Sequence, residues 1–374
     1  MSDLSIKKLG EITINLDRKR IPLNSKQRAE KESSPQYPYI GANNIMGYID
    51  EYIFDDRILC IAEDGGSWGR NERCAKIYEG KVWVNNHAHV LTECEGISLD
   101  YLCYFLNFAD LSMSITGATR GKLTQGALNN ILVPVPEFAN QQKIAHRLDQ
   151  IDRLRQSLRA EVAEYGRLGE AVFLEMFARD KAVNWPVRLF GELADSRLGK
   201  MLDKKKQHGK RQRKYLRNAN VQWFRFELED LHTMDIEESE EEKYGLKKGD
   251  VLICEGGDIG RAAIWDDELQ SCYYQKALHR VRVKESLMSP DFLVHWLYFQ
   301  SKNGGFDDYS SSATIAHLTG AKLKKMKISL PPINLQHKFA ARIRAIEALR
   351  GKAELALLEA DGLFGATLQG VFGG

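Results

Sequence analysis

Two glycine-rich turns, one in each half of the chain, have the composition of a site that binds an oxyanion. The first is Gly65-Gly66-Ser67-Trp68-Gly69-Arg70 and the second is Gly256-Gly257-Asp258-Ile259-Gly260-Arg261. Glycine lets the backbone approach a neighbour closely and leaves N–H groups free for an anion such as phosphate. The arginine that ends each turn adds a charged donor. The alternative interpretation is a structural turn that joins two strands.

A basic stretch is the second candidate for binding a polyanion. Ten lysines and arginines lie within the 21 residues from Arg197 to Arg217. A thinner version in the first half comprises Arg18, Lys19, Arg20, Lys26 and Arg28. The segment from Glu227 to Glu242 is almost as acidic, so the net charge of +2 hides a segregated distribution. Charge runs are often only solvated loops, but we expect this segregation to favour a basic surface that faces a polyanion.

A polar turn recurs at the same relative place in both halves. It reads Thr119-Arg120-Gly121-Lys122 in the first half and Thr314-Ile315-Ala316-His317 in the second. These side chains are able to contact a nucleic-acid backbone or base edges. A plain connecting turn is the alternative.

The sequence carries no convincing metal or catalytic motif. The spacing of His87, His89, Cys74 and Cys94 matches none of the usual structural-zinc patterns, so we expect no metal and interpret His89 and its match His279 as core or hydrogen-bonding residues. There is no glycine-rich cofactor loop, no Asn-Pro-Pro-aromatic tetrapeptide and no GxxxxGK[ST] loop. Asp250, Glu255 and Asp258 come closest to a nuclease cluster, but no other feature supports it.

An internal repeat sets the positions of these candidates. With a constant shift of 195, residues 118–154 match residues 313–349 at 12 of 37 positions without a gap. Upstream, Asp100-Tyr101-Leu102 matches Asp291-Phe292-Leu293, Gly65-Gly66 matches Gly256-Gly257, and Tyr39, Asn44 and Ile45 match Tyr215, Asn220 and Val221. The chain is therefore two copies of one unit, with insertions in surface loops.

Each copy is predicted to contain short strands followed by a long helix. Strand-like runs include 58–61, 82–84, 251–253 and 278–283, so the globular part is expected to be mixed α/β. Apolar residues at three- and four-residue steps predict one helix over Asn140–Ala178 and another that includes Phe339 to Ala360. A 39-residue helix would be about 58 Å long at ~1.5 Å per residue, and its stripe needs a partner along its length. We therefore expect the two helices to pair antiparallel in a coiled-coil-like spacer, related by pseudo-two-fold symmetry, with glycines such as Gly362 causing the second to fray near its end.

Composition bounds the class of protein. The 374 residues, of which 43% are hydrophobic and 28% charged, suffice for two soluble domains. No apolar run has the length expected of a membrane span, and the N-terminus has no secretory pattern. The six cysteines are sparse and mostly lie among apolar residues, which is typical of reduced, buried thiols in a cytoplasmic protein.

Four segments resemble the specificity subunits of type I restriction-modification systems. They are SATIAHLTGAKLKKMKISLPPINLQHKFAARI, which begins at Ser312, its twin over 117–148, LKKGDVLICEGGDIGRAAIW over 246–265, and WPVRLFGELAD over 185–195. The resemblance covers nearly the whole chain, including the order domain, helix, domain, helix. Any one motif is moderately specific, and the duplicated arrangement is much more so.

The resemblance implies a DNA-recognition subunit without catalytic activity. Each target-recognition domain would read one half of a bipartite target in double-stranded DNA. The helices would separate the halves and dock two adenine methyltransferase subunits, and restriction subunits would join to cut. The chain itself would need no cofactor, since S-adenosylmethionine and ATP with Mg²⁺ would be bound by the partners. No membrane partner is expected.

The prediction divides the chain into residues 1–138 (target-recognition domain 1), 139–180 (spacer helix 1), 181–333 (target-recognition domain 2) and 334–374 (spacer helix 2). The residues expected to contact DNA are Asn44, Ser67, Trp68, Arg70, Arg120, Lys122, Lys200, Lys204, Arg211, Arg213, Asn220, Arg261 and His317. One alternative is a single-chain nuclease or methyltransferase with duplicated recognition domains. Another is a scaffold whose helices and globular domains bind proteins.

Overall fold

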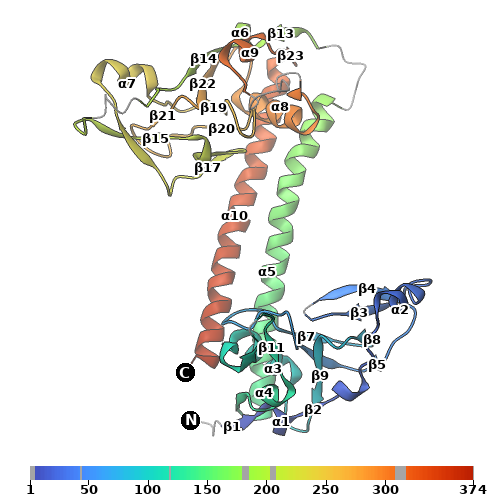
Figure 1. Ribbon diagram of the computed structural model, residues 1–374. Coiled ribbons are helices and arrows are strands. Elements are labelled where there is room, and N and C mark those ends of the chain that lie inside the picture. Colours follow the sequence, from blue (N-terminus) through green and yellow to red (C-terminus); the bar gives the residue numbers. More distant parts are fainter. Residues whose placement is uncertain are drawn as a thin grey trace. The chain divides into compact units, whose positions relative to one another are not determined.

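The computed structural model contains two compact units, each made of a globular domain and parts of both long helices. It describes residues 5–42, 44–117, 119–178, 185–202, 208–307 and 317–373. Unit 1 comprises residues 1–159 and 355–374, and unit 2 comprises residues 160–354. Both units mix helices and strands, as the sequence predicted (Figure 1).

The domain of unit 1 is built on two four-stranded sheets. The first sheet is antiparallel, with the order β2 (Thr13–Asn15), β9 (Ala88–Glu93), β6 (Ile58–Ala62), β7 (Ala75–Tyr78). The second has the order β4 (Ile45–Ile49), β3 (Tyr37–Ile40), β8 (Lys81–Val84), β5 (Phe54–Asp55), in which β3 and β8 are parallel. Every residue of β6 is buried, because this central strand carries apolar side chains on both faces.

Shorter elements complete this domain. Two strand pairs are β1 (Ser5–Lys8) with β12 (Leu132–Val135) and β10 (Ile115–Thr116) with β11 (Lys122–Leu123). The helices are α1 (Leu9–Ile12), α2 (Ser25–Glu30), α3 (Leu99–Phe108) and α4 (Gln125–Asn129), and the 3₁₀ turns are η1 (Asp17–Lys19) and η2 (Ser112–Ser114). The chain thus begins with a strand that passes directly into a short helix.

The domain of unit 2 repeats this plan. Its antiparallel sheet has the order β14 (Ala194–Leu198), β22 (Leu278–Val283), β19 (Val251–Cys254), β20 (Ala262–Ile264). Its second sheet has the order β18 (His232–Asp235), β15 (Gln212–Leu216), β21 (Tyr273–Tyr274), again with a parallel pair, β15 and β21. The same strand order in two segments with little identity confirms the repeat.

The remaining elements of unit 2 follow a similar order, with two additions among the described residues, a helix after β18 and a hairpin segment before it. β13 (Val187–Leu189) pairs with β23 (Lys327–Ser329), and the helices are α6 (Phe190–Leu193), α7 (Glu238–Tyr244), α8 (Pro290–Lys302) and α9 (Gly320–Lys325). Between β15 and β18 lies an extra segment with the 3₁₀ turn η5 (Asn218–Asn220) and the hairpin β16 (Val221–Gln222) and β17 (Arg225–Phe226). The sequence match of Asn44-Ile45 with Asn220-Val221 was therefore wrong, because Val221 belongs to this insertion.

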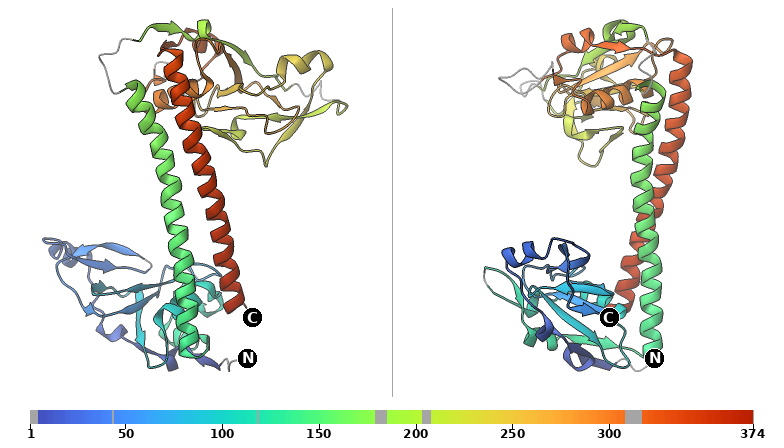
Figure 2. Two further views of the ribbon diagram at one scale, coloured as in Figure 1. Left: turned by 180° about the vertical axis from the view of Figure 1, so that it is seen from behind. Right: turned by 90° about the vertical axis from the view of Figure 1, so that its right-hand side faces the viewer.

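Each domain is followed by a long helix. Helix α5 spans Phe138–Phe173 and passes into a π-helical turn, Leu174–Ala178, while α10 spans Ile333–Phe372. The two are antiparallel within each unit, where Figures 1 and 2 show them side by side. In unit 1, Arg155 Nε donates to Asp361 Oδ1 at 2.5 Å, and in unit 2 the rings of Phe173 and Phe339 are 5.7 Å apart. The predicted helix pairing is thus confirmed within each unit.

Helix α10 does not fray at its glycines, contrary to the expectation. It continues to Phe372, whose ring lies 5.3 Å from Tyr101, 5.6 Å from Phe105 and 5.7 Å from Phe108. Packing of this terminal ring on α3 outweighs the roughly 1 kcal/mol that each glycine costs a helix.

Among the described helices, only α10 has the length and apolar composition that would let it cross a membrane. One such helix is weak evidence for a span, and the pairing with α5 gives its apolar residues another role. Ile343 and Ile346 are buried in unit 2, and Leu368 is buried in unit 1. All six cysteines are free, and Cys60, Cys74, Cys254 and Cys272 are buried, as predicted.

A buried glutamine attaches each long helix to its own domain. In unit 1 the side chain of Gln141 accepts from Ser98 N (3.0 Å) and donates to Gly96 O (3.2 Å) and Pro136 O (2.8 Å). In unit 2 Gln336 accepts from Ser289 N (2.9 Å) and donates to Leu287 O (3.1 Å) and Pro331 O (2.8 Å). Both glutamines are 0% exposed. This shared bond set explains why the glutamine is identical in the two repeats.

An aspartate organises the turn that precedes β15. Asp235 accepts from the backbone N–H groups of Arg211 (2.9 Å), Gly209 (2.7 Å) and His208 and from Gln212 Nε2 (2.9 Å). The Arg211 N–H is the largest cause that lowers the pKa of Asp235, to about 2, and it outweighs the opposing effect of burial. The ionised carboxylate therefore stabilises this turn.

We predict that Gln141→Leu destabilises unit 1 by about 2 kcal/mol or more, because it leaves one buried donor and two buried acceptors without partners. Urea unfolding followed by circular dichroism measures the change. The matched control is Gln142→Leu at the exposed neighbouring position, which should change stability by less than about 0.5 kcal/mol. Equal effects of the two substitutions would contradict the role of the buried amide.

We also predict a pH-dependent effect of Asp235→Asn. A carboxylate whose pKa is lowered by folding contributes stability above its unfolded pKa of about 3.9, and this contribution is lost as the pH falls towards about 2. Thermal unfolding should therefore show Asp235→Asn less stable than the wild type at pH 6, with the difference shrinking steadily between pH 4 and pH 2. A difference that stays constant over this range would contradict the prediction.

Candidate nucleic-acid interface

The first glycine turn and the polar turn of unit 1 form one surface. Leu123 N donates to Glu63 O at 2.8 Å and Gly65 N donates to Gly121 O at 3.3 Å, which places β11 against the end of β6. Gly65 has φ +62°, a left-handed conformation that favours glycine. Two of the three places identified in the sequence are therefore neighbours.

The cations of this surface are exposed and held by carboxylates. Arg120 Nη2 lies 2.7 Å from Asp64 Oδ1 and Lys122 Nζ lies 3.0 Å from Glu63 Oε1. The two cationic side chains are 62% and 49% exposed. His87 Nδ1 also lies 2.9 Å from Asp64 Oδ1. Exposed pairs of this kind contribute little net stability, so a phosphate is able to replace the carboxylates as partners.

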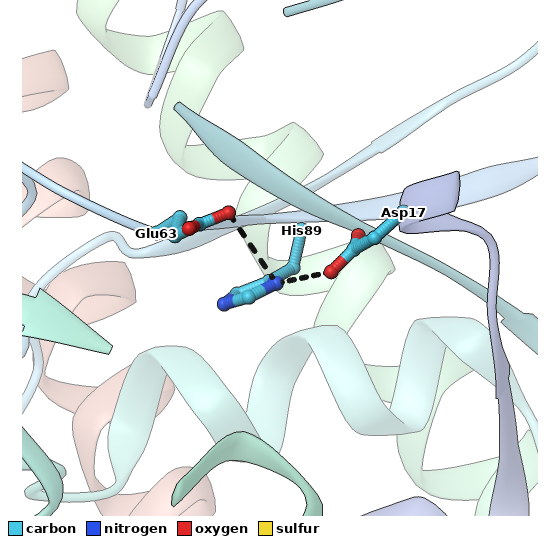
Figure 3. A group of neighbouring side chains, drawn as sticks. All are labelled: Asp17, Glu63 and His89. Atoms are coloured by element: carbon cyan, nitrogen blue, oxygen red, sulfur yellow. Dashed lines mark hydrogen bonds and ion pairs between the residues drawn. The ribbon is translucent and has the colours of Figure 1, made fainter. Parts of the chain in front are cut away.

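A buried histidine fixes β11 from behind. His89 Nε2 donates to Leu123 O at 2.7 Å, and its Nδ1 lies 2.6 Å from Asp17 Oδ2. Figure 3 shows the ring between the carboxylates of Asp17 and Glu63. The pKa of Asp17 lies below its ordinary value because bonds from His89 and Val90 N outweigh the opposing effect of burial. The sequence prediction that His89 is a hydrogen-bonding core residue is confirmed.

Asp17, Glu63 and His89 offer ligand atoms within 4.8 Å of one another, a spacing that would suit a metal ion. Their negative charge is already compensated, however, since Arg20 lies 2.7 Å from Glu63 and 3.4 Å from Asp17, and Lys122 lies 3.0 Å from Glu63. Bonds from Arg20 and Lys122 outweigh burial and lower the pKa of Glu63. We therefore interpret the cluster as an ion-pair network and assign no metal to it.

Unit 2 repeats the backbone of this surface with different side chains. Leu318 N donates to Glu255 O at 2.7 Å, and His279 Nε2 donates to Leu318 O at 2.8 Å. Gly257, with φ +75°, occupies the place of Gly65. Burial lowers the pKa of His279, and among the described residues no carboxylate bonds to its Nδ1. The histidine that bonds to the leucine carbonyl thus has a carboxylate partner, Asp17, in unit 1, and no such partner among the described residues in unit 2.

This geometry corrects the alignment of the glycine turns by one residue. Gly65 matches Gly257, where the sequence comparison had paired it with Gly256. Arg70 and Arg261 are not counterparts, because Cys254 N donates to Arg261 O in the place where Ala62 N donates to Cys74 O. Arg261 Nη2 donates to Asn218 O at 3.0 Å, so it braces a neighbouring turn.

The side chains of the first glycine turn differ in how accessible they are to a ligand. Trp68 is 7% exposed and its Nε1 donates to Ala62 O at 3.1 Å, so in this structure its side chain is not open to the DNA contact predicted for it. Arg70 is exposed but stacks on Phe108 at 4.9 Å and donates to Gln369 Oε1 at 2.5 Å, which ties it to the end of α10. Ser67 is exposed and stays a candidate.

The basic stretch of unit 2 is paired with the acidic segment, contrary to the inferred segregation. Arg211 lies 3.1 Å from Glu238, Arg213 lies 3.2 Å from Glu241, and Lys200 forms an ion pair with Glu240. All three acidic partners lie in α7, which follows β18 in sequence. Lys200 is mostly buried by these contacts, and Lys204 lies outside the described residues. The exposed cations of this segment that form no ion pair among the described residues are Arg197, Lys210 and Lys214.

The other residues predicted to contact DNA are also partly exposed and partly buried. Asn44 is exposed beside the β3–β4 turn, where its carbonyl accepts from Gly41 N at 2.9 Å. Asn220 is 3% exposed and donates to Glu227 O (2.9 Å) and Asp230 O (3.1 Å), so in this structure its side chain is occupied within the domain and not open to the DNA contact predicted for it. His317 is exposed next to Leu318, while Thr314, Ile315 and Ala316 lie outside the described residues.

Sequence reasoning did not identify the loop between β8 and β9 as part of this surface. Asn85 N donates to Ile40 O (3.1 Å) and Asn85 Oδ1 accepts from His87 N (2.8 Å), which brings the β3–β4 turn to the glycine turn. The matching loop of unit 2 carries an exposed Lys276. No local motif marks this loop, and only its position after β8 and β21 could have indicated it.

Comparisons with known proteins agree with this architecture. Residues 1–164 and 182–359 match the model of the type I restriction modification DNA specificity domain. A Haemophilus influenzae protein named as a type I restriction enzyme specificity subunit is 28% identical over 372 residues, covering 93% of this chain and 89% of that one. The Escherichia coli EcoprrI specificity subunit is 30% identical over 128 residues, or 34% of this chain and 31% of that one.

Two solved structures share the fold. The S subunit of a type I restriction-modification system from M. genitalium gives a TM-score of 0.67 at 12% identity, covering 98% of this chain and 96% of that chain. A chain from a study of complex assembly and conformational transition of the type I R-M system gives a TM-score of 0.55 at 15% identity, covering 99% and 97%. Because the two family matches fall on the two repeats, this chain belongs to the type I restriction-modification DNA specificity family, whose members recognise DNA and are not themselves catalysts.

Proposed function

We propose that each unit reads one half of a bipartite DNA target, and that DNA approaches the surface formed by the glycine turn and β11 in unit 1 and by their counterparts in unit 2. The observation that carries this proposal is a repeated pair of hydrogen bonds, which we call the backbone bracket. In each unit the N–H of a leucine, Leu123 or Leu318, donates to a glutamate carbonyl, and the leucine carbonyl accepts from a buried histidine. In both units the bracket presents polar side chains at one edge of the domain. The side chains differ between the units, which is what two different half-sites require.

Arg120 and Lys122 are the residues through which we expect unit 1 to bind phosphate. Both are exposed, both lie on a backbone fixed from behind, and both have carboxylate partners that water screens. Cations that neutralise phosphates release counterions from DNA, and this release supplies much of the affinity. Arginine is also able to form two bonds to one guanine. The carboxylates of Asp64 and Glu63 would orient these cations before DNA binds.

The partners follow from the same proposal. The long helices would dock two methyltransferase subunits that bind S-adenosylmethionine, and restriction subunits would bring ATP and Mg²⁺. Family membership favours this division of labour over a single-chain nuclease or methyltransferase. Each long helix contributes residues to both units, which supports a spacer role.

We predict that Arg120→Gln and Lys122→Gln each weaken DNA binding, because each removes one phosphate contact. Each should also reduce the magnitude of the slope of log K against log salt concentration by about 1. DNA binding by the assembled complex is measured at salt concentrations from about 50 to about 200 mM. The matched control is Arg57→Gln, since Arg57 is also ion-paired (Asp100, 2.5 Å) but precedes β6 at the opposite end of the strand. Unchanged salt slopes in both test variants would refute the assignment of these residues.

We also predict that inserting four residues after Arg159 and four after Glu354 widens the gap between the methylated half-sites. One added helical turn is about 6 Å, or roughly one or two base pairs, and neither half-site should change. Mapping modified adenines genome-wide measures both. An unchanged gap in a folded, active complex would contradict the spacer role.

A further inference from the structure

Unit 1 contains an open groove with a volume of about 790 Å³ between β7, α3 and the paired long helices. Its wall combines aromatic rings, such as those of Tyr104 and Phe364, with charged side chains that include Asp149, Asp152 and Asp361. The rings of Tyr104 and Phe364 lie 6.1 Å apart, and Tyr104 Oη donates to Asp149 Oδ1 at 2.6 Å. The groove lies outside the DNA-facing surface and has no role in the function described so far.

The same place in unit 2 holds only a small cavity of about 100 Å³. The repeat alignment and the strand pairings match six lining positions: Ile77 with Ile264, Asp100 with Asp291, Cys103 with Val294, Tyr104 with His295, Asp149 with Arg344 and Asp152 with Glu347. The two cavities are therefore versions of one feature, and they differ mainly in how full they are.

The chain itself fills the groove of unit 2. The β16–β17 hairpin places Trp223 and Phe224 at its tip, and the Phe224 ring lies 4.6 Å from His295 and 5.2 Å from Tyr298 on α8. Phe224 N donates to Ala262 O at 3.0 Å, which attaches the hairpin to β20. Phe224 has φ +67°, a conformation that costs a non-glycine residue energy and that these contacts must offset.

Unit 1 lacks this hairpin because its connection is shorter. Residues 41–44 join β3 to β4, whereas residues 217–231 join the equivalent β15 and β18. The backbone bond that the hairpin makes in unit 2 is replaced in unit 1 by Asn107, which accepts from Ala75 N and donates to Ala75 O, both at 2.9 Å. The edge of β7 is thus satisfied, while the space that an aromatic side chain occupies in unit 2 stays open.

We propose that the groove of unit 1 receives an aromatic side chain from a segment of a partner protein, and that this partner is the methyltransferase subunit. The occupant of the matching groove shows the chemistry that this feature accommodates, which is an aromatic ring against apolar and aromatic side chains, with charged groups at the same wall. The identity of the partner rests on the proposed function. An asymmetric chain with one filled and one open groove would then bind its two methyltransferase copies differently.

Gly365 offers a way to close the groove without disturbing the fold. It lines the groove, and a Cβ built on it has no other atom within 4 Å. Gly365→Trp should therefore fold normally, since a larger residue replaces a helix-weakening glycine. Gly362→Trp is the matched control, because Gly362 lies on the same helix with equal space and does not line the groove. Thermal unfolding of both variants verifies folding.

The experiment titrates the full chain with purified methyltransferase subunit and measures the stoichiometry and affinity of assembly. We expect Gly365→Trp to weaken one of the two binding steps about tenfold or more, as the loss of a buried aromatic contact would, and Gly362→Trp to stay within about twofold. If both variants bind the methyltransferase subunit as tightly as the wild-type chain does, the proposal is overturned. An equal loss in both would assign docking to the exposed helix face and would overturn it as well.

Photo-cross-linking identifies the occupant directly. p-Benzoylphenylalanine at position 365 in the assembled complex should label a methyltransferase segment that contains an aromatic residue, and replacing that residue by alanine should weaken assembly as Gly365→Trp does. A labelled segment without an aromatic residue would refute the proposed chemistry. Target-specific methylation by the wild-type complex is measured in the same preparation. Its absence would instead refute the proposed function.

Discussion

The attachment of each long helix to its domain depends on one buried amide. A glutamine side chain is one of the few that accept and donate from the same end, and Gln141 and Gln336 use both capacities. Each joins the N–H at the start of α3 or α8 to carbonyls of the preceding loop and of the segment just before the long helix. An apolar residue would fill the space but leave buried polar groups unpaired. The direction in which each helix leaves its domain is therefore specified by hydrogen bonds as well as by packing.

The second constant feature is the histidine that bonds to the backbone behind the edge proposed to face DNA. His89 and His279 bond the same carbonyl in each unit, but only His89 has a carboxylate partner, Asp17, at its other nitrogen among the residues that the structure describes. The unit in which the histidine has this carboxylate partner also carries the cations Arg120 and Lys122, just before and at the start of β11. The bracket is thus a common support on which two different surfaces are built. Rigid support beneath variable side chains is what a reader of two unlike half-sites needs, because base contacts require fixed geometry.

Much of the fold could be predicted from the sequence, because the repeat and the helical stripes are regular signals. The 12 identities in 37 positions mark Gln141 with Gln336, and Leu123 with Leu318, as equivalent residues. Their roles depend largely on contacts between residues more than 30 positions apart, such as His89 with Leu123, which no local pattern encodes. The register of the glycine turns was wrong for a related reason. Two adjacent glycines look alike in sequence, and only the left-handed φ of Gly65 and Gly257 distinguishes them.

The candidate site was harder to predict than the fold because charge in a sequence does not show which charges pair. Arg211, Arg213 and Lys200 have the pattern of a free basic stretch, yet α7 supplies a carboxylate to each. Arg120 and Lys122 are weaker signals in a short polar turn, yet they are the exposed cations on a fixed edge. The insertion at 217–231 was equally hard to interpret, because its sequence resembles that of an ordinary loop. In unit 2 this insertion fills the groove that stays open in unit 1. The two repeats therefore differ at the place where we propose that a second molecule binds.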